Sequence, residues 1–157
     1  PQSIVSPEDQ TVTFVELFFD LVFVFSVTQV VSLLHHGLDW TVVGQSILVF
    51  WLVWWAWTQF TWSLNAADTT HYLVEIGVLA ATAVAFFMAV AVPGAFADRS
   101  LWFAVTYVLV RVLGLTLYEW VASEDASQRA AVRRFTLVSA GGLFVVLVGG
   151  YLGGTAQ

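Results

Sequence analysis

Two carboxylates lie inside a stretch of the sequence that is otherwise apolar. Glu16 and Asp20 fall within residues 14–34, which at about 1.5 Å per residue are long enough to cross a bilayer as a helix. Because they are four positions apart, they share one face of that helix. A lone charge that faces lipid costs about 2.5 to 3.5 kcal/mol. We therefore expect this acidic face to be turned toward the protein interior.

A cationic side chain lies in the middle of another apolar stretch. Arg111 does not lose its charge at ordinary pH, so at that depth it must form an ion pair, reach water or extend toward the membrane surface. The sequence predicts a salt bridge from Arg111 to Asp20, Glu16 or Glu75. Together with polar residues near the ends of other apolar stretches, these side chains form a predicted polar cluster of Glu16, Asp20, Gln59, Glu75, Arg111 and Glu119.

The predicted polar cluster has two interpretations. Four carboxylates around one arginine are not all comfortably ionised, because desolvation and like charge disfavour the ionised form. We therefore expect a shared proton, a bound cation or a water cluster there, and such a site is typical of proton or cation transport. In the other interpretation the cluster is structural. It would then hold the helices of a membrane scaffold or partner-binding protein in register through buried hydrogen bonds and one ion pair.

A third hypothesis is a metal-dependent membrane enzyme. Asp68, His71 and Glu75 have the i, i+3, i+7 spacing that places three ligand types on one helical face. Helix capping by Asp68 or Thr69, with Glu75 near the positive end of a helix, explains the same residues. The sequence contains no nucleophile and base arrangement and no Gly-rich phosphate loop, and it predicts no cofactor.

Composition places these side chains in a membrane protein. Hydrophobic residues make up 59% of the chain and charged residues 10%, against about 45 to 50% and about 25% in soluble domains. The absence of cysteine excludes disulfides, thiol nucleophiles and thiolate metal sites. The net charge of −6 argues against a nucleic-acid partner. The sequence thus predicts an all-α, polytopic transmembrane helix bundle whose partner is the lipid bilayer.

Polar and glycine-containing segments divide the chain into five predicted spans. A polar segment, residues 1–13, precedes a helical domain, 14–154, with spans at 14–34, 42–64, 72–92, 101–121 and 135–153. Arg129, Arg133 and Arg134 fall in loops on the N-terminal side, and Arg99 falls on the opposite side. The positive-inside rule therefore predicts a cytoplasmic N-terminus.

Residue patterns within the spans predict how the helices pack. In the second span an amide and indole stripe of Gln45, Trp55, Gln59 and Trp62 is expected to turn toward the acidic face of the first span. The third span carries small residues at every fourth position, from which we expect the tightest helix contact: Gly77, Ala81, Ala85 and Ala89.

The last predicted span carries glycines on one face. Gly142, Gly149 and Gly153 are typical of close helix packing. Because no further span follows in this sequence, we expect their packing partner to lie outside these residues.

The first span also carries a resemblance to a known family. Glu16-Leu-Phe-Phe-Asp20-Leu-Val-Phe-Val-Phe25 followed by Thr28-Gln29 resembles the signature of the bacterial low temperature requirement A family. The likeness continues through residues 50–62, 64–68 and 107–111. The chain departs from the family pattern just before the motif, where Gln10-Thr11 replaces a basic residue.

The resemblance implies a multi-pass protein of the bacterial inner membrane whose biochemical activity is not established. Members of the family are usually longer than this chain. The resemblance therefore implies that these residues form the N-terminal half of a longer protein, and that the second half or another copy of the chain is a partner.

Overall fold

The computed structural model describes residues 12–35, 37, 39–68, 71–122 and 129–155. The described residues form five α-helices and one short 3-10 helix. Their bounds are α1 Phe14–Leu34, α2 Trp40–Ala66, α3 Tyr72–Ala91, η1 Val92–Gly94, α4 Ser100–Ala122 and α5 Arg129–Thr155. Each α-helix contains a segment long and apolar enough to cross a membrane. The predicted all-α bundle with five spans is confirmed, while residues 1–11 of the predicted polar segment lie outside the described residues.

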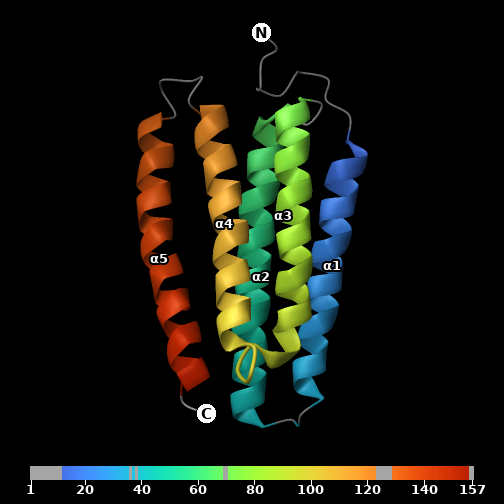
Figure 1. Cartoon of the computed structure of the whole chain (residues 1–157), viewed down its shortest axis with the longest axis vertical. Helices are drawn as coiled ribbons and strands as arrows, with labels where there is room; N and C mark the ends of the chain where they lie inside the picture. The colour runs from blue at the N-terminus through green and yellow to red at the C-terminus, as the bar shows by residue number, and fades with distance from the viewer. Residues whose placement is uncertain (1–11, 36, 38, 69–70, 123–128, 156–157) are drawn as a thin grey trace.

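The helices run alternately up and down, so the two chain ends lie at opposite ends of the molecule (Figure 1). Helix α1 packs against α2 and α3, and α4 packs against the same two helices from the other side. Helix α5 packs mainly against α4, at the edge of the bundle. The described residues therefore form a ring of four helices, in which α1 and α4 each pack against both α2 and α3, and a fifth helix that lies along α4.

Local capping explains where two of the helices begin. Thr13 is the N-cap of α1, and its Oγ1 accepts a hydrogen bond from Glu16 N at 3.4 Å. His71 caps α3 in a similar way, with Nδ1 accepting from Leu73 N at 3.3 Å. This corrects the expectation that Asp68 or Thr69 caps α3, although Thr69 lies outside the described residues. Both caps satisfy backbone N–H groups that have no partner within the helix.

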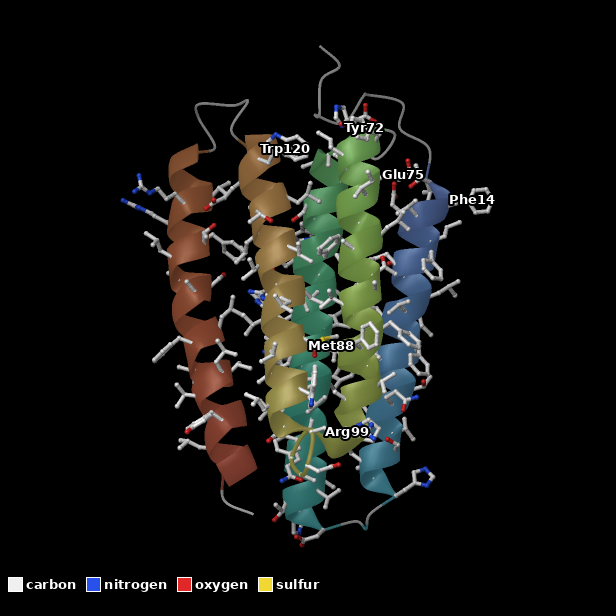
Figure 2. The ribbon with its side chains drawn as sticks, viewed as in Figure 1. Phe14, Tyr72, Glu75, Met88, Arg99 and Trp120 are labelled. Atoms are coloured by element: carbon white, nitrogen blue, oxygen red, sulfur yellow. The ribbon has the colours of Figure 1, made fainter. Side chains whose placement is uncertain are left out.

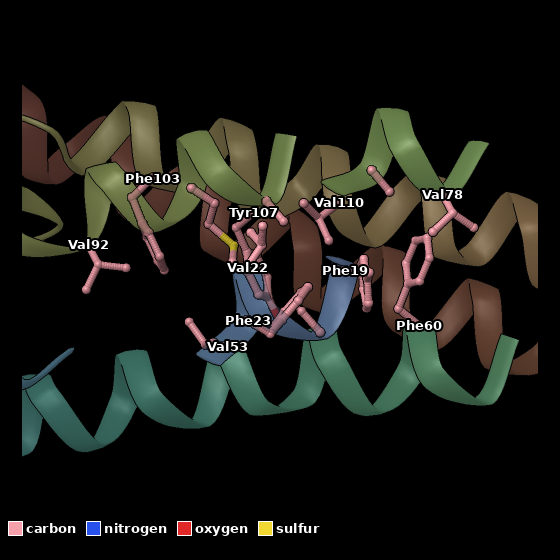
Figure 3. Packing of buried hydrophobic residues seen from close by; sticks show 14 of the residues in the cluster. Phe19, Val22, Phe23, Val53, Phe60, Val78, Val92, Phe103, Tyr107 and Val110 are labelled. Atoms are coloured by element: carbon pink, nitrogen blue, oxygen red, sulfur yellow. The ribbon is translucent and has the colours of Figure 1, made fainter. Parts of the chain in front are cut away.

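Aromatic residues from α1 and α2 fill the centre of the four-helix part. Phe19 stacks on Phe60 with ring centroids 4.4 Å apart and lies 4.7 Å from the Phe23 ring. Figure 3 shows these rings packed near Val53 in the interior. Such offset and tilted ring pairs add to the dispersion energy of a packed core. They determine which side of α1 faces inward.

Small residues of α3 give these large side chains room. Ala81, Ala85 and Ala89 are fully buried, so three of the four positions of the small-residue strip face the interior. The expectation that this strip makes the tightest helix contact is wrong, because α4 and α5 share more close residue pairs than α3 shares with any helix. Gly77 is only half-buried, and a Cβ atom built there would meet no described atom within 4 Å. The close helix approach therefore begins at Ala81 rather than at Gly77.

Helix α5 touches α4 through one of the expected glycines, Gly153, and through Gly150, which was not expected. A Cβ atom at Gly150 would collide with the Ala104 side chain, and Ser100 Oγ donates to Gly150 O at 3.1 Å. Gly153 also lies beside Ser100, whereas Gly142 and Gly149 have no described atom within 4 Å of a built Cβ. The expected glycine face is thus divided, because helix rotation brings Gly150 rather than Gly149 to the α4 contact.

Candidate functional site

Glu16 has a local structural role at the start of α1. Thr13 Oγ1 donates to Glu16 Oε1 at 3.0 Å while it accepts from the Glu16 backbone N–H. This exchange belongs to the same class as the capping box, in which a threonine and a glutamate three residues apart stabilise a helix start. Glu16 is half-buried, so it lies at the rim of the bundle rather than in its interior.

Asp20 lies one turn deeper, on the outer face of the bundle. It is six residues into α1, or about 9 Å along the helix axis, and it is exposed. Trp57 Nε1 of α2 donates to Asp20 Oδ1 at 2.8 Å. The expectation that the acidic face points inward is therefore wrong for Asp20. The physical reason is that α1 is apolar around most of its circumference, so the stacking of Phe19 and Phe23, and not a polar stripe, determines its rotation.

A groove of about 450 Å³ runs beside Asp20 between α1 and α2. Its walls include the rings of Trp54 and Trp57, whose centroids lie 5.2 Å apart at an interplanar angle of 48°. Asp20 is the one charged residue among the described residues that line the groove. The other residues that line it are Phe23, Val24, Val27, Thr28 and Val53. We call this feature the α1–α2 groove.

A second polar feature joins α2 to α4. Gln59 Nε2 lies 3.5 Å from Arg111 O, Ser63 Oγ lies 3.2 Å from Gly114 O, and Arg111 Nη1 lies 3.5 Å from Trp55 O. All three contacts run from a side-chain donor to a backbone carbonyl of the facing helix. We call these five residues the α2–α4 polar seam. The seam holds the two helices in register by hydrogen bonds within the apolar part of the bundle.

Gly114 makes the close approach at this seam possible. A Cβ atom there would lie 2.9 Å from Phe60 Cδ2 and 3.2 Å from Gln59 Nε2. Both side chains are buried, so neither has free space into which it could move. Sequence reasoning singled out Gln59 and Arg111 but not Ser63 or Gly114, because a lone serine or glycine in an apolar helix carries no pattern of its own.

The predicted salt bridge of Arg111 is not formed in the part of the chain that the structure describes. Arg111 is 3% exposed, and no carboxylate of the described residues lies within salt-bridge distance of it. Arg111 Nε and Gln59 Oε1 are buried without a hydrogen-bond partner among the described atoms. The predicted polar cluster therefore separates into an acidic site on the α1 side of α2 and a cationic site on the α4 side.

The geometry of α2 explains this separation. Trp57 and Gln59 are two residues apart, which is a rotation of about 200° around a helix. Trp57 consequently reaches Asp20 of α1, while Gln59 faces Arg111 of α4. The predicted stripe on α2 is corrected in the same way. Gln59 is buried and Gln45 half-buried, but Trp55 and Trp62 are exposed and do not face the acidic side of α1.

The remaining acidic candidates lie near the ends of their helices. Glu75 is in the first turn of α3 and Glu119 is near the end of α4, and both side chains are exposed. Figure 2 shows Glu75 at the same end of the bundle as Phe14 and Trp120, with Arg99 toward the opposite end. They are therefore placed where charged groups reach the membrane surface, and neither pairs with Arg111 among the described residues.

The possible metal ligands are not brought together. Within the described ranges, no three His, Cys, Asp or Glu side chains come close enough to hold a metal ion. His71 instead caps α3, stacks near Tyr72 at 5.7 Å and meets Trp120 edge-on at 6.1 Å. The i, i+3, i+7 spacing fails because Asp68 and His71 precede α3 and do not continue its helical face.

Comparison with known proteins shows the family to which the chain belongs. A family model described as bacterial low temperature requirement A protein (LtrA) matches residues 11–157. The uncharacterized protein RA0937 of Rhizobium meliloti (strain 1021) is 35% identical over 105 residues, which are 66% of this chain and 26% of that protein. The match thus spans about a quarter of the relative's length. No solved structure matches the chain. With five membrane-length helices and a family match over nearly its whole length, the chain belongs to the bacterial low temperature requirement A family of multi-pass membrane proteins.

Proposed function

We propose that this protein transports a proton or a cation across the inner membrane, with Asp20 as the group that binds it. The observation that carries the proposal is the position of Asp20 in the apolar part of α1, with no cationic side chain of the described residues within salt-bridge distance. A carboxylate in hydrocarbon is stable when it carries a proton or pairs with a cation. Trp57 holds one carboxylate oxygen, which orients the group toward the α1–α2 groove.

The role that the sequence suggested for Arg111 changes in this proposal. Arg111 lies in the α2–α4 polar seam and bonds to the backbone of α2, so it does not compete with a cation at Asp20. Its charge instead raises the electrostatic potential of the neighbouring interior. That potential favours keeping the transported cation on the α1 side of α2.

A flux assay tests the proposal. The chain is reconstituted in liposomes, and proton, sodium and potassium fluxes are measured under an imposed gradient. Asp20→Asn keeps an oxygen acceptor for Trp57 but removes the charge, so we expect it to reduce the flux at least tenfold. The matched control is Asp98→Asn, which removes one exposed charge in the α3–α4 connection and should leave the flux unchanged. Equal flux in all three proteins, or none in the unsubstituted chain, would contradict the proposal.

A structural role for the polar residues is the second candidate, and the Asp20–Trp57 hydrogen bond favours it. This bond joins α1 to α2 through residues that are 37 positions apart in sequence. A hydrogen bond to a charged group contributes about 1.5 to 3 kcal/mol to the free energy of unfolding. In this interpretation Asp20→Ala and Trp57→Phe each lower the stability in detergent. Their double mutant should then show a coupling energy of about 1 kcal/mol. Such coupling without any change in flux would establish the structural role in place of transport.

A further inference from the structure

We propose that the α1–α2 groove binds an organic cation, an ammonium group attached to an apolar body, that reaches the groove from the lipid. This inference rests on the proposed function in one respect, namely that Asp20 is the cation-binding group. It goes further by naming the class of ligand. The argument uses the charge of the groove, its donors, its aromatic walls and its size.

The charge of the groove is negative and fixed in place. Of the side chains that the structure describes, Asp20 is the one charged group that lines it. The 2.8 Å bond from Trp57 Nε1 occupies Oδ1 and restrains the carboxylate. Asp20 itself is exposed, and no hydrogen bond to Oδ2 is formed in the part of the chain that the structure describes. A positioned acceptor with one available oxygen is complementary to a single cationic group.

The side-chain donors of the groove favour a cation over an anion. Two of the three described side-chain donors on the lining are used within the protein: the N–H of Trp57 is donated to Asp20, and the hydroxyl of Thr28 is donated to Phe25 O at 2.7 Å. The third is the indole N–H of Trp54. What they leave for a ligand is the negative charge of the Asp20 carboxylate, which attracts an ammonium group and repels a carboxylate or phosphate.

The walls of the groove favour an organic cation over a metal ion or a hydrated alkali ion. Trp54, Trp57 and Phe23 contribute aromatic surface, and the two indoles meet at 48°. Ring faces attract cations by about 0.5 to 2 kcal/mol, and indole does so best. An inorganic ion needs a shell of oxygen ligands, whereas this groove offers one carboxylate and mostly carbon.

The size and position of the groove agree with such a ligand. Its volume of about 450 Å³ lies in the range of small-molecule sites, about 300 to 1,000 Å³. Val24, Val27 and Trp54 are exposed on the outer surfaces of α1 and α2. A ligand with an apolar body is concentrated in the bilayer by the hydrophobic effect and can enter the groove from there.

A binding experiment with two probes of one shape tests this inference. Benzyltrimethylammonium is titrated into the full chain in lipid nanodiscs by calorimetry, with neopentylbenzene, its uncharged carbon analogue, as the matched probe. We expect saturable binding of the ammonium probe and no competition from the carbon analogue. Asp20→Asn should weaken binding at least tenfold and Trp54→Leu severalfold, while Asp98→Asn should leave it unchanged.

The outcomes separate this inference from the proposed function. Equal binding of both probes, or full binding by Asp20→Asn, would show partition into lipid or an apolar surface and would overturn the inference. Proton or alkali-ion flux that depends on Asp20, with no binding of the ammonium probe, would also overturn it while leaving the proposed function intact. Ammonium binding that depends on Asp20 and Trp54, with no flux, would support the groove as an organic-cation site and contradict transport. Circular dichroism of each variant verifies that a loss of binding is not a loss of folding.

Discussion

At the scale of single residues, the two charged side chains of the described residues that lie farthest from the ends of their helices have opposite surroundings. Asp20 is exposed on the outer surface and has a strong hydrogen bond from Trp57. Arg111 is almost completely buried, and among the described residues its guanidinium makes one long contact, to the Trp55 backbone carbonyl. A buried charge without a counter-ion lowers the stability of the fold, because its desolvation costs more free energy than the interaction with one carbonyl dipole contributes. Arg111 is therefore expected to lower the stability of this bundle.

Replacing Arg111 by an apolar residue of similar length tests this expectation. Arg111→Met removes the buried charge and keeps most of the packing, so the free energy of unfolding in detergent should rise by about 1 kcal/mol or more. Arg111→Lys, which keeps the charge but loses the planar donors, should not be stabilised. Thermal unfolding followed by circular dichroism measures both. A loss of 3 kcal/mol or more in Arg111→Met would mean that Arg111 has an acidic partner in the folded protein.

At the scale of elements, α2 separates the two polar features. One side of α2 presents Trp57 to α1, and the opposite side presents Gln59 and Ser63 to α4. The α2–α4 side is the more tightly constrained, because Gly114 leaves no room for another carbon atom beside Phe60. Helix rotation on both sides of α2 is thereby fixed by side-chain packing rather than by a polar pattern.

The constraint at Gly114 predicts a difference between two glycine substitutions. Gly114→Ala introduces a Cβ into a filled space, and overpacking of this kind costs about 1 to 3 kcal/mol. Gly77→Ala is the matched control in α3, because a Cβ there meets no described atom within 4 Å. In a helix interior, alanine is also more favourable than glycine by about 1 kcal/mol. We therefore expect Gly114→Ala to lower the unfolding temperature and Gly77→Ala to leave it equal or higher, and equal losses would contradict the described α2–α4 contact.

At the scale of the whole molecule, the start of α1 and the end of α5 lie at opposite ends of the bundle (Figure 1). Arg133 and Arg134 are exposed near the start of α5, and Arg99 follows the opposite end of α3. We propose that the arginine-rich end, and with it the N-terminus, lies in the cytoplasm, because positive residues are retained on that side.

Cysteine labelling tests this orientation, since the chain contains no cysteine of its own. Asn65→Cys lies at the end of α2 on the N-terminal side, and Ala97→Cys lies in the connection between α3 and α4; both positions are exposed. A maleimide that does not cross membranes should label Ala97→Cys in spheroplasts. It should label Asn65→Cys only after the membrane is opened. The reverse pattern would place the N-terminus outside.

The sequence by itself determined the membrane class, the number of spans and most of their limits. Bilayer thickness requires about 20 apolar residues for each helix, and polar connections such as those after Leu34 and Ala66 end the apolar runs. It also marked Asp20, Gln59 and Arg111 as polar residues at membrane depth. These properties depend on local composition and length, which can be counted along the chain.

Only the tertiary structure decided which residues face one another. Helices such as α1 are apolar on all sides, so hydrophobic periodicity does not determine their rotation. The stacking of Phe19 on Phe60 and the close approach at Gly114 determine it instead. With this rotation, Asp20 accepts a hydrogen bond from Trp57, and Arg111 contacts the backbone of α2. The aspartate and the arginine, which the sequence predicted to form a salt bridge, are therefore apart. Contacts between distant residues depend on how whole helices pack, which the composition of any one helix does not contain.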